Sequence, residues 1–313
     1  MRTFTSWSGL KQADRGAAAA IGNFDGVHIG HQAVIDQTRA VAAKTAAPLG
    51  IVTFEPHPRE IFAPNAPPFR LMSAETKSHR LEKLGVDFLY QLDFNTELSS
   101  LMPEQFARDV IADGLGLSHV VVGRDFCFGK GRAGNAADLA AFGQAMGFGV
   151  TIADLIKTEG FEVSSTSIRS ALSDGRPRDA AAMLGHWHRI DGAVIHGEKR
   201  GRPLGFPTAN MSITGLHPPR FGIYAVKADV LTGPYAGSYD GAASIGVRPT
   251  FGENAANLET YLFDFDADLY GAHLSVALVD YLRPELKFDS LDALINQMNA
   301  DCTQARAILA DVT

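Results

Sequence analysis

The spacing of apolar residues changes once along this chain of 313 residues, near Gly185, and that change constrains the fold more than any other feature. Up to that residue, short apolar runs of strand length alternate with segments in which apolar residues recur at helical spacing. Strands that alternate with helices favour parallel crossovers, so residues 1–184 are predicted to form an α/β domain with an open parallel sheet. The strands are expected at 17–24, 49–56, 86–94, 118–123 and 148–155, and the helices at 31–44, 73–85, 102–116 and 135–147.

Beyond Gly185, strand-like runs separated by turns rich in glycine and proline dominate the sequence. This pattern indicates a small antiparallel β-barrel, which we expect to occupy residues 185–313. The linker is expected at 173–188, where one or two short helices can form. A C-terminal helix is expected at 290–309, with Asp289 or Ser290 as its cap. The apolar stripe of that helix comprises Leu291, Leu294, Ile295, Met298, Cys302, Ala305 and Leu309.

Composition and charge argue against several classes of protein. The net charge is -7, from 28 basic and 35 acidic residues, whereas a protein that holds long nucleic acid usually has a basic footprint. No nucleic-acid partner is therefore expected. Two cysteines far apart give no disulfide framework and fit a reducing compartment. We expect a cytoplasmic protein with no membrane segment, because no apolar run reaches the ~18 residues that span a bilayer and no signal-like segment begins the chain.

The first candidate site is the stretch GNFDGVHIGHQAV, which joins a predicted strand to a predicted helix. In an open α/β sheet, ligands bind beyond the carboxyl ends of the strands, and the free N–H groups of a helix start suit phosphate. Gly22, Gly26 and Gly30 allow the backbone to turn tightly and to approach a ligand. His28 and His31 can donate to phosphate oxygens as charge develops during transfer. The alternative interpretation is a glycine turn with two surface histidines.

A second element, SSTSIRSAL, begins another predicted helix. Ser164 or Ser165 can cap this helix. Arg169 is expected in its first turn, where a guanidinium near free N–H groups makes a second phosphate clamp. An ordinary capped helix is the alternative interpretation.

The segment GFPTAN indicates phosphate chemistry in the second half of the chain. Pro207 fixes the backbone before Thr208, and Thr208 and Asn210 face the same side of an extended strand. Their oxygens suit Mg²⁺, which takes its other ligands from water and phosphate. Residues 164–220 also contain eight basic and four acidic residues, as suits a region that handles phosphate. A solvated charged face is the alternative interpretation of that excess.

The first two elements together resemble the adenylyltransferase half of bacterial FAD synthetases, within the nucleotidyltransferase superfamily. That superfamily explains the letters HIGH, which one class of aminoacyl-tRNA synthetases shares, but the Lys-Met-Ser-Lys-Ser loop of those enzymes is absent here. The stretches TFEPHP and VGRDFCFGKGRAGN also match the FAD synthetase pattern. The resemblance implies a Rossmann-like domain whose ATP site comprises Gly22, Asn23, Phe24, Asp25, His28, Gly30, His31, Ser164, Ser165, Thr166 and Arg169.

The same resemblance places the flavin beside His57, Asp125, Phe126 and Phe128. Aromatic rings can stack on an isoalloxazine, and a carboxylate can accept from a ring N–H or a hydroxyl. The alternatives are core packing for the two phenylalanines and a simple turn for His57.

The segment GFPTAN closely resembles the Pro-Thr-Ala-Asn motif of riboflavin kinases, and SIGVRPTFG followed by LETYLFDFDADLYG completes that pattern. The resemblance implies that Pro207, Thr208 and Asn210 organise ATP and Mg²⁺. It also implies that Gly201 and Gly205 flank the phosphate loop.

Riboflavin kinases have a glutamate in a later strand as catalytic base, and the resemblance identifies it as Glu259. A base accepts the proton of the attacking flavin hydroxyl, while positioning and charge neutralisation do the rest of phosphoryl transfer. Without the resemblance, Glu259 would be interpreted as an exposed carboxylate on a strand. Arg248 is expected near the flavin. Tyr261 stands where the family often has histidine, so that position is assigned no role.

These features predict a bifunctional enzyme that phosphorylates riboflavin with ATP to give FMN, and then joins FMN to the α-phosphate of a second ATP to give FAD and pyrophosphate. Residues 1–184 would carry the adenylyltransferase and residues 185–313 the kinase. The expected partners are small molecules, and the sequence indicates no oligomeric state. Two alternatives stay open: an adenylyltransferase for another phosphorylated cofactor, and a non-catalytic flavin carrier that kept the fold. The remaining histidines are interpreted as structural, and Cys127 is assigned no chemistry.

Overall fold

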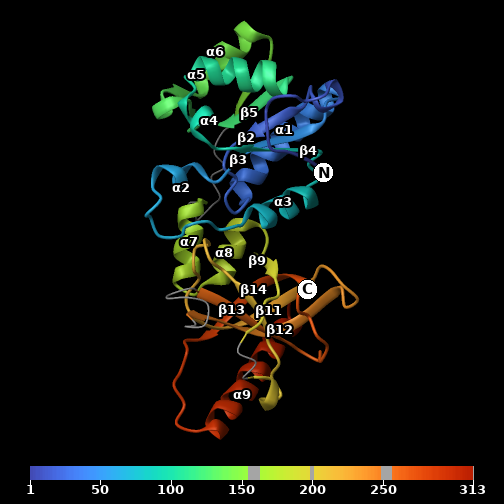
Figure 1. Ribbon diagram of the computed structural model, residues 1–313, viewed down its shortest axis with the longest axis vertical. Helices are drawn as coiled ribbons and strands as arrows, with labels where there is room; N and C mark the ends of the chain where they lie inside the picture. Colours follow the sequence, from blue (N-terminus) through green and yellow to red (C-terminus); the bar gives the residue numbers. More distant parts are fainter. Residues whose placement is uncertain (154–162, 198–200, 248–255, 313) are drawn as a thin grey trace. The chain divides into compact units, whose positions relative to one another are not determined.

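The computed structural model describes residues 1–153, 163–197, 201–247 and 256–312. The chain divides into two compact units, which are described separately: Met1–Ala66 with Lys77–Glu162, and Pro67–Thr76 with Val163–Thr313. The helices α7 (Ser165–Ser173) and α8 (Pro177–Leu184) belong to the second unit, as the ribbon in Figure 1 lets the reader follow. The boundary at 184 between the two activities stays a prediction, because a compact unit and a functional domain need not end at the same residue.

A parallel sheet of six strands forms the first unit, which confirms the predicted α/β architecture. The strand order is β1-β4-β3-β2-β5-β8, and every neighbouring pair is parallel. Ala18, Ala19 and Ala20 in the central strand are 0% exposed, because both faces of a doubly wound sheet are covered by helices. The strands are β1 (Arg2–Phe4), β2 (Ala18–Ile21), β3 (Leu49–Glu55), β4 (Phe88–Asp93), β5 (His119–Gly123) and β8 (Gly149–Ala153).

Each helix predicted between these strands is present, with one change of type. The third helix begins as α5 (Pro103–Gln105), with Pro103 in its first turn as predicted, and continues as the π-helix η2 (Phe106–Leu115). Its apolar residues pack with those of α6 against alternate residues of the sheet. The other helices are α1 (Ile29–Thr45), α3 (Ala74–Lys83) and α6 (Ala136–Met146). The short elements that were not predicted include β1, α2 (Pro58–Phe62) and α4 (Thr96–Ser100).

The direction of the crossovers reverses between β2 and β5. Strand β2 leads through α1 to β3 on one side, and β5 leads through α6 to β8 on the other. At such a switch point the loops beyond the carboxyl ends of the strands diverge and leave room for a ligand. The loops that follow β2 and β5 contain residues 22–28 and 124–126, so candidate residues predicted for ATP and for flavin both occur at this switch point.

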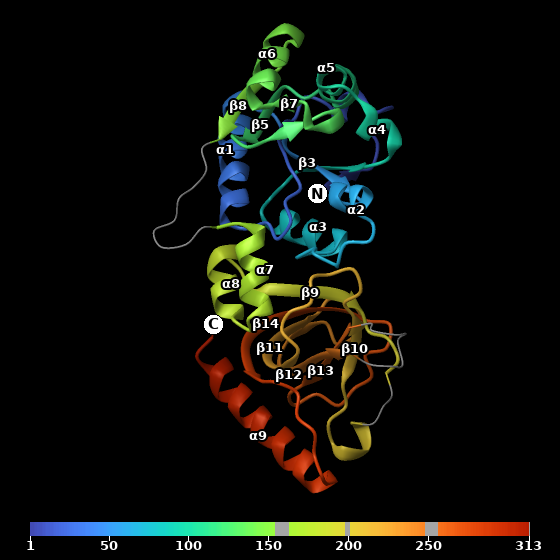
Figure 2. The same cartoon turned by 90° about the vertical axis from the view of Figure 1, so that its left-hand side faces the viewer.

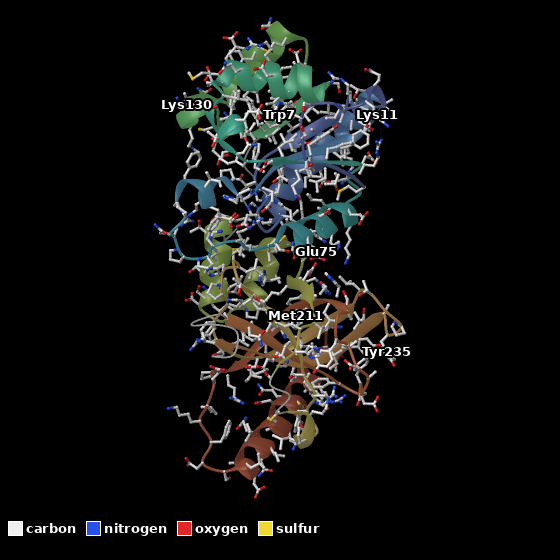
Figure 3. The ribbon with its side chains drawn as sticks, viewed as in Figure 1. Trp7, Lys11, Glu75, Lys130, Met211 and Tyr235 are labelled. Atoms are coloured by element: carbon white, nitrogen blue, oxygen red, sulfur yellow. The ribbon has the colours of Figure 1, made fainter. Side chains whose placement is uncertain are left out.

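The second unit contains the predicted antiparallel barrel, which is nearly closed. The strand order is β10-β13-β12-β11-β14-β9, and a single bridge from Ile195 to Asn210 links the end of β9 to β10. Figure 2 shows the strands curving around a common interior, where Met211, labelled in Figure 3, is 0% exposed. The strands are β9 (His188–Ala193), β10 (Ala209–Ser212), β11 (Gly222–Val230), β12 (Gly237–Val247), β13 (Ala256–Leu262) and β14 (His273–Arg283).

The C-terminal helix α9 (Leu291–Ala310) is present, and Ser290 is its cap. The predicted apolar stripe is only partly buried. Ala305 and Leu309 are buried in the core beside the barrel strands, whereas Leu291 is 56% exposed. The stripe therefore contacts the barrel at the C-terminal end of the helix. No helix of the described residues has the length and apolar character needed to cross a membrane.

His188 at the start of β9 gives the second unit an expected pH dependence. Its side chain is 2% exposed, and burial, helped by His186 and His217, lowers its pKa from 6.5 to about 3. Between these two pKa values the unfolded chain binds a proton at His188 and the folded chain does not. The free energy of unfolding should therefore fall as the pH falls, by up to ~1.4 kcal/mol per pH unit. Urea unfolding at about pH 7 and about pH 5 measures this.

The control compares His188→Gln with His196→Gln, since His196 is exposed. We expect the pH-dependent loss of stability to shrink in His188→Gln alone. Equal losses in the wild type and in His188→Gln would mean that another group is responsible.

Candidate active sites

The loop after β2 brings the two predicted histidines together. His28 is the N-cap of α1, and its Nδ1 accepts a hydrogen bond from the backbone N–H of His31 at 3.3 Å. The two imidazole rings stack with their centroids 3.6 Å apart. His28 is 8% exposed, so it is not the surface histidine of the alternative interpretation. Because Nδ1 of His28 is an acceptor, its proton lies on Nε2, the nitrogen that is left for a ligand.

The same loop has a strained backbone. Phe24 and Val27 have φ values of 50° and 44°, in the left-handed region that side chains rarely adopt, and Gly26 has a φ of 87°. Both apolar side chains are buried, which holds the strain in place, as is common in loops that bind ligands. Gly26 thus turns the backbone as predicted, whereas Gly30 lies inside the helix and leaves room for His28, since a Cβ there would be 3.1 Å from Nδ1 of His28.

Burial keeps both histidines neutral. It lowers the pKa of His28 to about 4, against a smaller opposing effect of a backbone hydrogen bond. It also lowers the pKa of His31 well below the ordinary value, and the charges of His28 and Lys77 lower it further. A neutral imidazole donates one hydrogen bond, so each ring offers one N–H to a phosphate oxygen. Within the described residues, Nδ1 of His31 is buried without a hydrogen-bond partner, which fits a group that a ligand completes.

His57 has a local structural role at the end of β3. It caps α2: its Nδ1 accepts from the N–H of Arg59 at 3.1 Å, and its own N–H donates to Glu60 at 2.9 Å. This capping box fits the alternative of a turn residue. The flavin contact of His57 stays a prediction.

The three residues assigned to the flavin after β5 differ in accessibility. The rings of Phe126 and Phe128 stack with centroids 5.5 Å apart; Phe128 is in β6 (Cys127–Phe128), which pairs with β7 (Gly134–Asn135), and Phe126 immediately precedes β6. Phe128 is 6% exposed and packs in the core, whereas Phe126 is half-buried and Asp125 is exposed. The alternative of core packing therefore fits Phe128, and of these three side chains Asp125 and Phe126 have surface left for a ligand.

Helix α7 begins where the sequence predicts. Ser164 caps it by accepting a hydrogen bond from the N–H of Ser167 at 3.1 Å. Arg169 lies in the second turn and not in the first as predicted, because the helix starts immediately after Ser164. Its guanidinium donates to the carbonyl of Phe69 at 3.3 Å and to Oγ1 of Thr166 at 3.3 Å. Arg169 thus has polar partners within its own unit, and its contact with phosphate stays a prediction.

In the barrel, β10 and β13 bring the predicted metal ligands and the predicted base together. Asn210 and Glu259 are directly opposite each other in the antiparallel register. Opposed residues of such a pair have their Cβ atoms roughly 4.5–5.5 Å apart, on the same face of the sheet. Thr208 lies just before β10, and its Oγ1 accepts a hydrogen bond from Nδ2 of Asn210 at 3.4 Å. Residues about fifty positions apart in the sequence therefore form one oxygen-rich cluster on a single face.

Asn257 orients this cluster, although the sequence analysis missed it. Its side chain is 2% exposed, and its Nδ2 donates to Oδ1 of Asn210 at 3.0 Å. Asn210 in turn donates to Thr208, so its amide is held from both ends while one lone pair of Oδ1 stays available. The signal in the sequence was the position of Asn257 two residues before Glu259, on the same face of a strand.

The oxygen atoms of Thr208 and Asn210 fit Mg²⁺, a hard cation that prefers oxygen ligands. In the described part of the chain, no group of three or more His, Cys, Asp and Glu side chains is placed to hold a metal ion alone. A Mg²⁺ ion at this cluster would therefore share its coordination with water and phosphate oxygens.

Two adjoining hollows open beside the cluster. Arg202, Pro207, Thr208 and Tyr270 line both. Gly201 and Asn210 line the smaller one, so four of the five residues predicted for the kinase ATP site border it, while Gly205 and the base Glu259 do not line either hollow. Tyr270, which sequence reasoning missed, stacks on His196 with ring centroids 4.0 Å apart.

Both glycines assigned to the phosphate loop are required by the backbone. Gly205 ends the 3₁₀ turn Arg202–Leu204 with a φ of 85°. At Gly201, any Cβ would collide with the carbonyl oxygen of Phe206. The turn that precedes Thr208 therefore depends on glycine at both positions.

Two predictions of the sequence analysis receive less support. Arg248 lies outside the described residues. The local excess of basic residues is partly a solvated face, as the alternative interpretation holds, because Arg176 pairs with Asp174 at 2.9 Å and Arg178 with Asp280 at 2.7 Å.

Lys77 on α3 is the most buried charged side chain near the first site, and the sequence analysis also missed it. It is 2% exposed. Its position was a signal: Lys77 stands four and seven residues before Leu81 and Leu84, in the apolar stripe of the helix.

Comparisons with known proteins identify both halves of the chain. Residues 10–167 match the family model described as FAD synthetase, and residues 184–309 match that described as riboflavin kinase. A bifunctional riboflavin kinase/FMN adenylyltransferase from Pseudomonas fluorescens is 42% identical, over 96% of this chain and 96% of its own. Proteins of the same name from Listeria monocytogenes and Escherichia coli are each 37% identical, over 93% and 95% of this chain and 92% and 94% of theirs.

A solved structure extends the likeness to the fold of the whole chain. The crystal structure of a macrolide-efflux protein from Streptococcus pneumoniae is similar to this chain with a TM-score of 0.82 and 29% identity, over 100% of this chain and 99% of that one.

Proposed function

The chain belongs to the family of bifunctional riboflavin kinases/FMN adenylyltransferases, and from this premise we propose how its two reactions are distributed over its residues. The enzyme phosphorylates riboflavin to FMN and adenylylates FMN to FAD. We assign the adenylyltransferase to residues 1–184 and the kinase to residues 185–313.

In the kinase, we propose that Glu259 accepts the proton of the 5′-hydroxyl of riboflavin as that oxygen attacks the γ-phosphorus of ATP. The new O–P bond forms as the bond to the β-phosphate oxygen breaks, and ADP leaves. Mg²⁺ held through Thr208 and Asn210 would neutralise charge on the phosphates. The observation that carries this assignment is the register of β10 and β13, which puts the proposed base opposite a proposed metal ligand.

In the adenylyltransferase, we propose that a phosphate oxygen of FMN attacks the α-phosphorus of ATP and that pyrophosphate leaves. Nε2–H of His28, one N–H of His31 and the free N–H groups at the start of α1 would donate to the phosphate oxygens as charge builds. Each ring, neutral because burial lowers its pKa, still has one N–H for this role. FMN provides the nucleophile, so the reaction needs no covalent enzyme intermediate.

We further propose that the enzyme works in the cytoplasm on small molecules and handles no nucleic acid. A net charge of -7 supports the second statement, and two cysteines, Cys127 and Cys302, that form no disulfide support the first.

Incubation with riboflavin, ATP and Mg²⁺, followed by chromatography of the flavins over time, tests the proposed function. Riboflavin should disappear, FMN should rise and then fall, and FAD and pyrophosphate should accumulate together. A protein that binds flavin without consuming ATP would instead be a carrier. FMN that accumulates with no FAD, while another phosphorylated cofactor is adenylylated, would favour the other adenylyltransferase.

A further inference from the structure

Lys77 carries a positive charge into the interior of the first unit. Burial of an ammonium group costs several kcal/mol unless its partners compensate, and an apolar side chain is often more stable at such a position. Lys77 stands in the apolar stripe of α3 with 2% of its surface exposed. A buried charge of this kind needs polar partners, and the partners show which part of the structure it holds.

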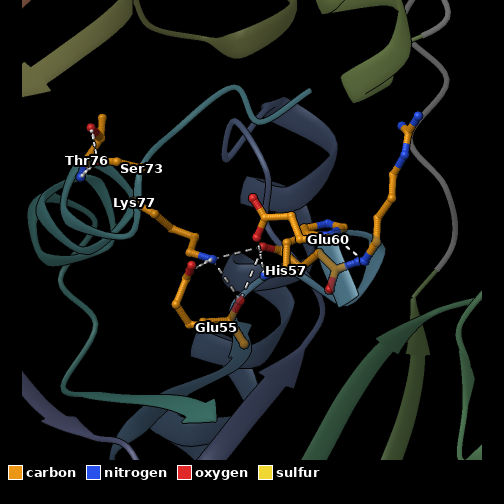
Figure 4. A network of polar contacts seen from close by, with 9 residues as sticks. Glu55, His57, Glu60, Ser73, Thr76 and Lys77 are labelled. Atoms are coloured by element: carbon orange, nitrogen blue, oxygen red, sulfur yellow. Dashed lines mark hydrogen bonds and ion pairs between the residues drawn. The ribbon is translucent and has the colours of Figure 1, made fainter. Parts of the chain in front are cut away.

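The ammonium of Lys77 reaches the base of the loop that carries the two histidines. Nζ donates to the carbonyl oxygen of Asn23 at 3.4 Å and to Oγ1 of Thr53 at 3.2 Å, and lies 3.9 Å from Oε2 of Glu55. Thr53 in turn donates to the same carbonyl of Asn23 at 3.2 Å. Figure 4 shows Lys77 directed from α3 towards Glu55 and the turn that bears His57 and Glu60.

The position of the Asn23 carbonyl affects the conformation of the loop that follows it. It immediately precedes Phe24, whose φ of 50° is strained, and the chain reaches His28 four residues later. Two hydrogen bonds to a single carbonyl, one of them from a charged donor, hold the start of the strained segment against β3.

We propose that Lys77 is a positioning residue for adenylyl transfer: through the carbonyl of Asn23 and the hydroxyl of Thr53 it fixes the loop that sets His28 and His31. The proposal rests on the function assigned above to these histidines. It adds a residue that acts through the loop.

The charge of Lys77 gives this role a second consequence. The titratable groups that face His31 are His28 on its own helix and Lys77 on α3, while Glu55 faces Lys77 from β3, with His57 and Glu60 on the adjacent turn. Loss of the positive charge at position 77 removes one of the causes that lower the pKa of His31. The pKa of His31 should therefore rise in such a variant, although burial, the largest cause, persists.

The test measures FAD formation from supplied FMN and ATP in Lys77→Met, with Lys83→Met as the matched control, since Lys83 is exposed on the same helix. We expect a loss of about 10²-fold in the kcat of adenylylation for Lys77→Met, the size that misplacement of a reacting group causes. The pKa of the His31 imidazole, followed by NMR, should rise. Lys77→Arg should restore part of the rate, and total phosphorylation of riboflavin should stay unchanged in every variant.

Wild-type adenylylation and an unchanged pKa of His31 in Lys77→Met would overturn the proposal. If Lys77→Met does not fold, Thr53→Val decides, because it removes the second donor to Asn23 with little change of shape; an undiminished rate of FAD formation in Thr53→Val would then overturn it. A wild-type enzyme that makes no FAD from FMN would contradict the proposed function itself, which separates the two failures.

Discussion

Substitution of His31 by alanine is expected to stop the enzyme at FMN. Riboflavin should still be phosphorylated, because that chemistry is assigned to the barrel, but FAD should form roughly 10²–10³-fold more slowly, the usual cost of one preorganised donor to a developing charge. A time course with riboflavin, ATP and Mg²⁺, with the flavins resolved by chromatography, measures both activities in one sample.

Two further variants sharpen this test. His119→Ala is the matched control. His119 is the first residue of β5, so it lies at the amino ends of the strands, away from the carboxyl ends where the site is. His28→Asn keeps a side chain that can cap α1 but removes the Nε2 donor, so it should lose FAD formation with the helix intact. FAD formed at an undiminished rate by His31→Ala would remove that histidine from the chemistry.

Local patterns predicted most of the fold because they report on burial. The buried run of Ala18 to Ala20 and the helical spacing of α1 are set by which faces are covered, and the periods of 2 and 3.6 residues record that directly. The misses have physical causes. Strand β1 has three residues and pairs on one side only, so its sequence carries little apolar signal. The π-helix η2 has an apolar face much like that of an α-helix, so spacing did not distinguish the two.

The candidate sites were predictable to the extent that a motif is contiguous. GNFDGVHIGHQAV placed His28 and His31 correctly at the start of a helix, since the strand, the turn and the cap are all local. The positive φ of Val27 was not predictable, because the fold forces that conformation against the preference of the residue. The capping box at His57 requires the Glu60 carboxylate to accept a hydrogen bond from the backbone N–H of His57. The two prolines that flank His57 in the sequence did not reveal this contact.

Long-range pairing accounts for what the sequence could not show in the barrel. The face shared by Thr208 and Asn210 follows from the period of a strand. That Glu259 lies opposite Asn210 depends on the register of β10 against β13, and a slip of one residue would turn Glu259 to the other face. The support from Asn257 depends on the same register.

That register leads to the second large effect: Glu259→Gln is expected to slow FMN formation severely. Glutamine keeps the length and shape of the side chain, and so the strand pairing, but it cannot accept the proton of the flavin hydroxyl. The rate of riboflavin phosphorylation should fall by roughly 10²–10⁴-fold, the usual contribution of a general base. FAD should still form at the wild-type rate when FMN is supplied, because adenylylation is assigned to the other half of the chain.

The matched control is Asp240→Asn, which neutralises an exposed carboxylate on the barrel strand β12. This control stands for the alternative interpretation of Glu259 as a surface charge: if only net charge or strand stability matters, both variants should lose a similar, small share of kinase activity. A selective loss in Glu259→Gln, with unchanged thermal unfolding and unchanged use of FMN, identifies the proton acceptor. Normal phosphorylation of riboflavin by Glu259→Gln would show that the hydroxyl proton leaves by another route, and that the register of β10 and β13 serves only to orient Asn210.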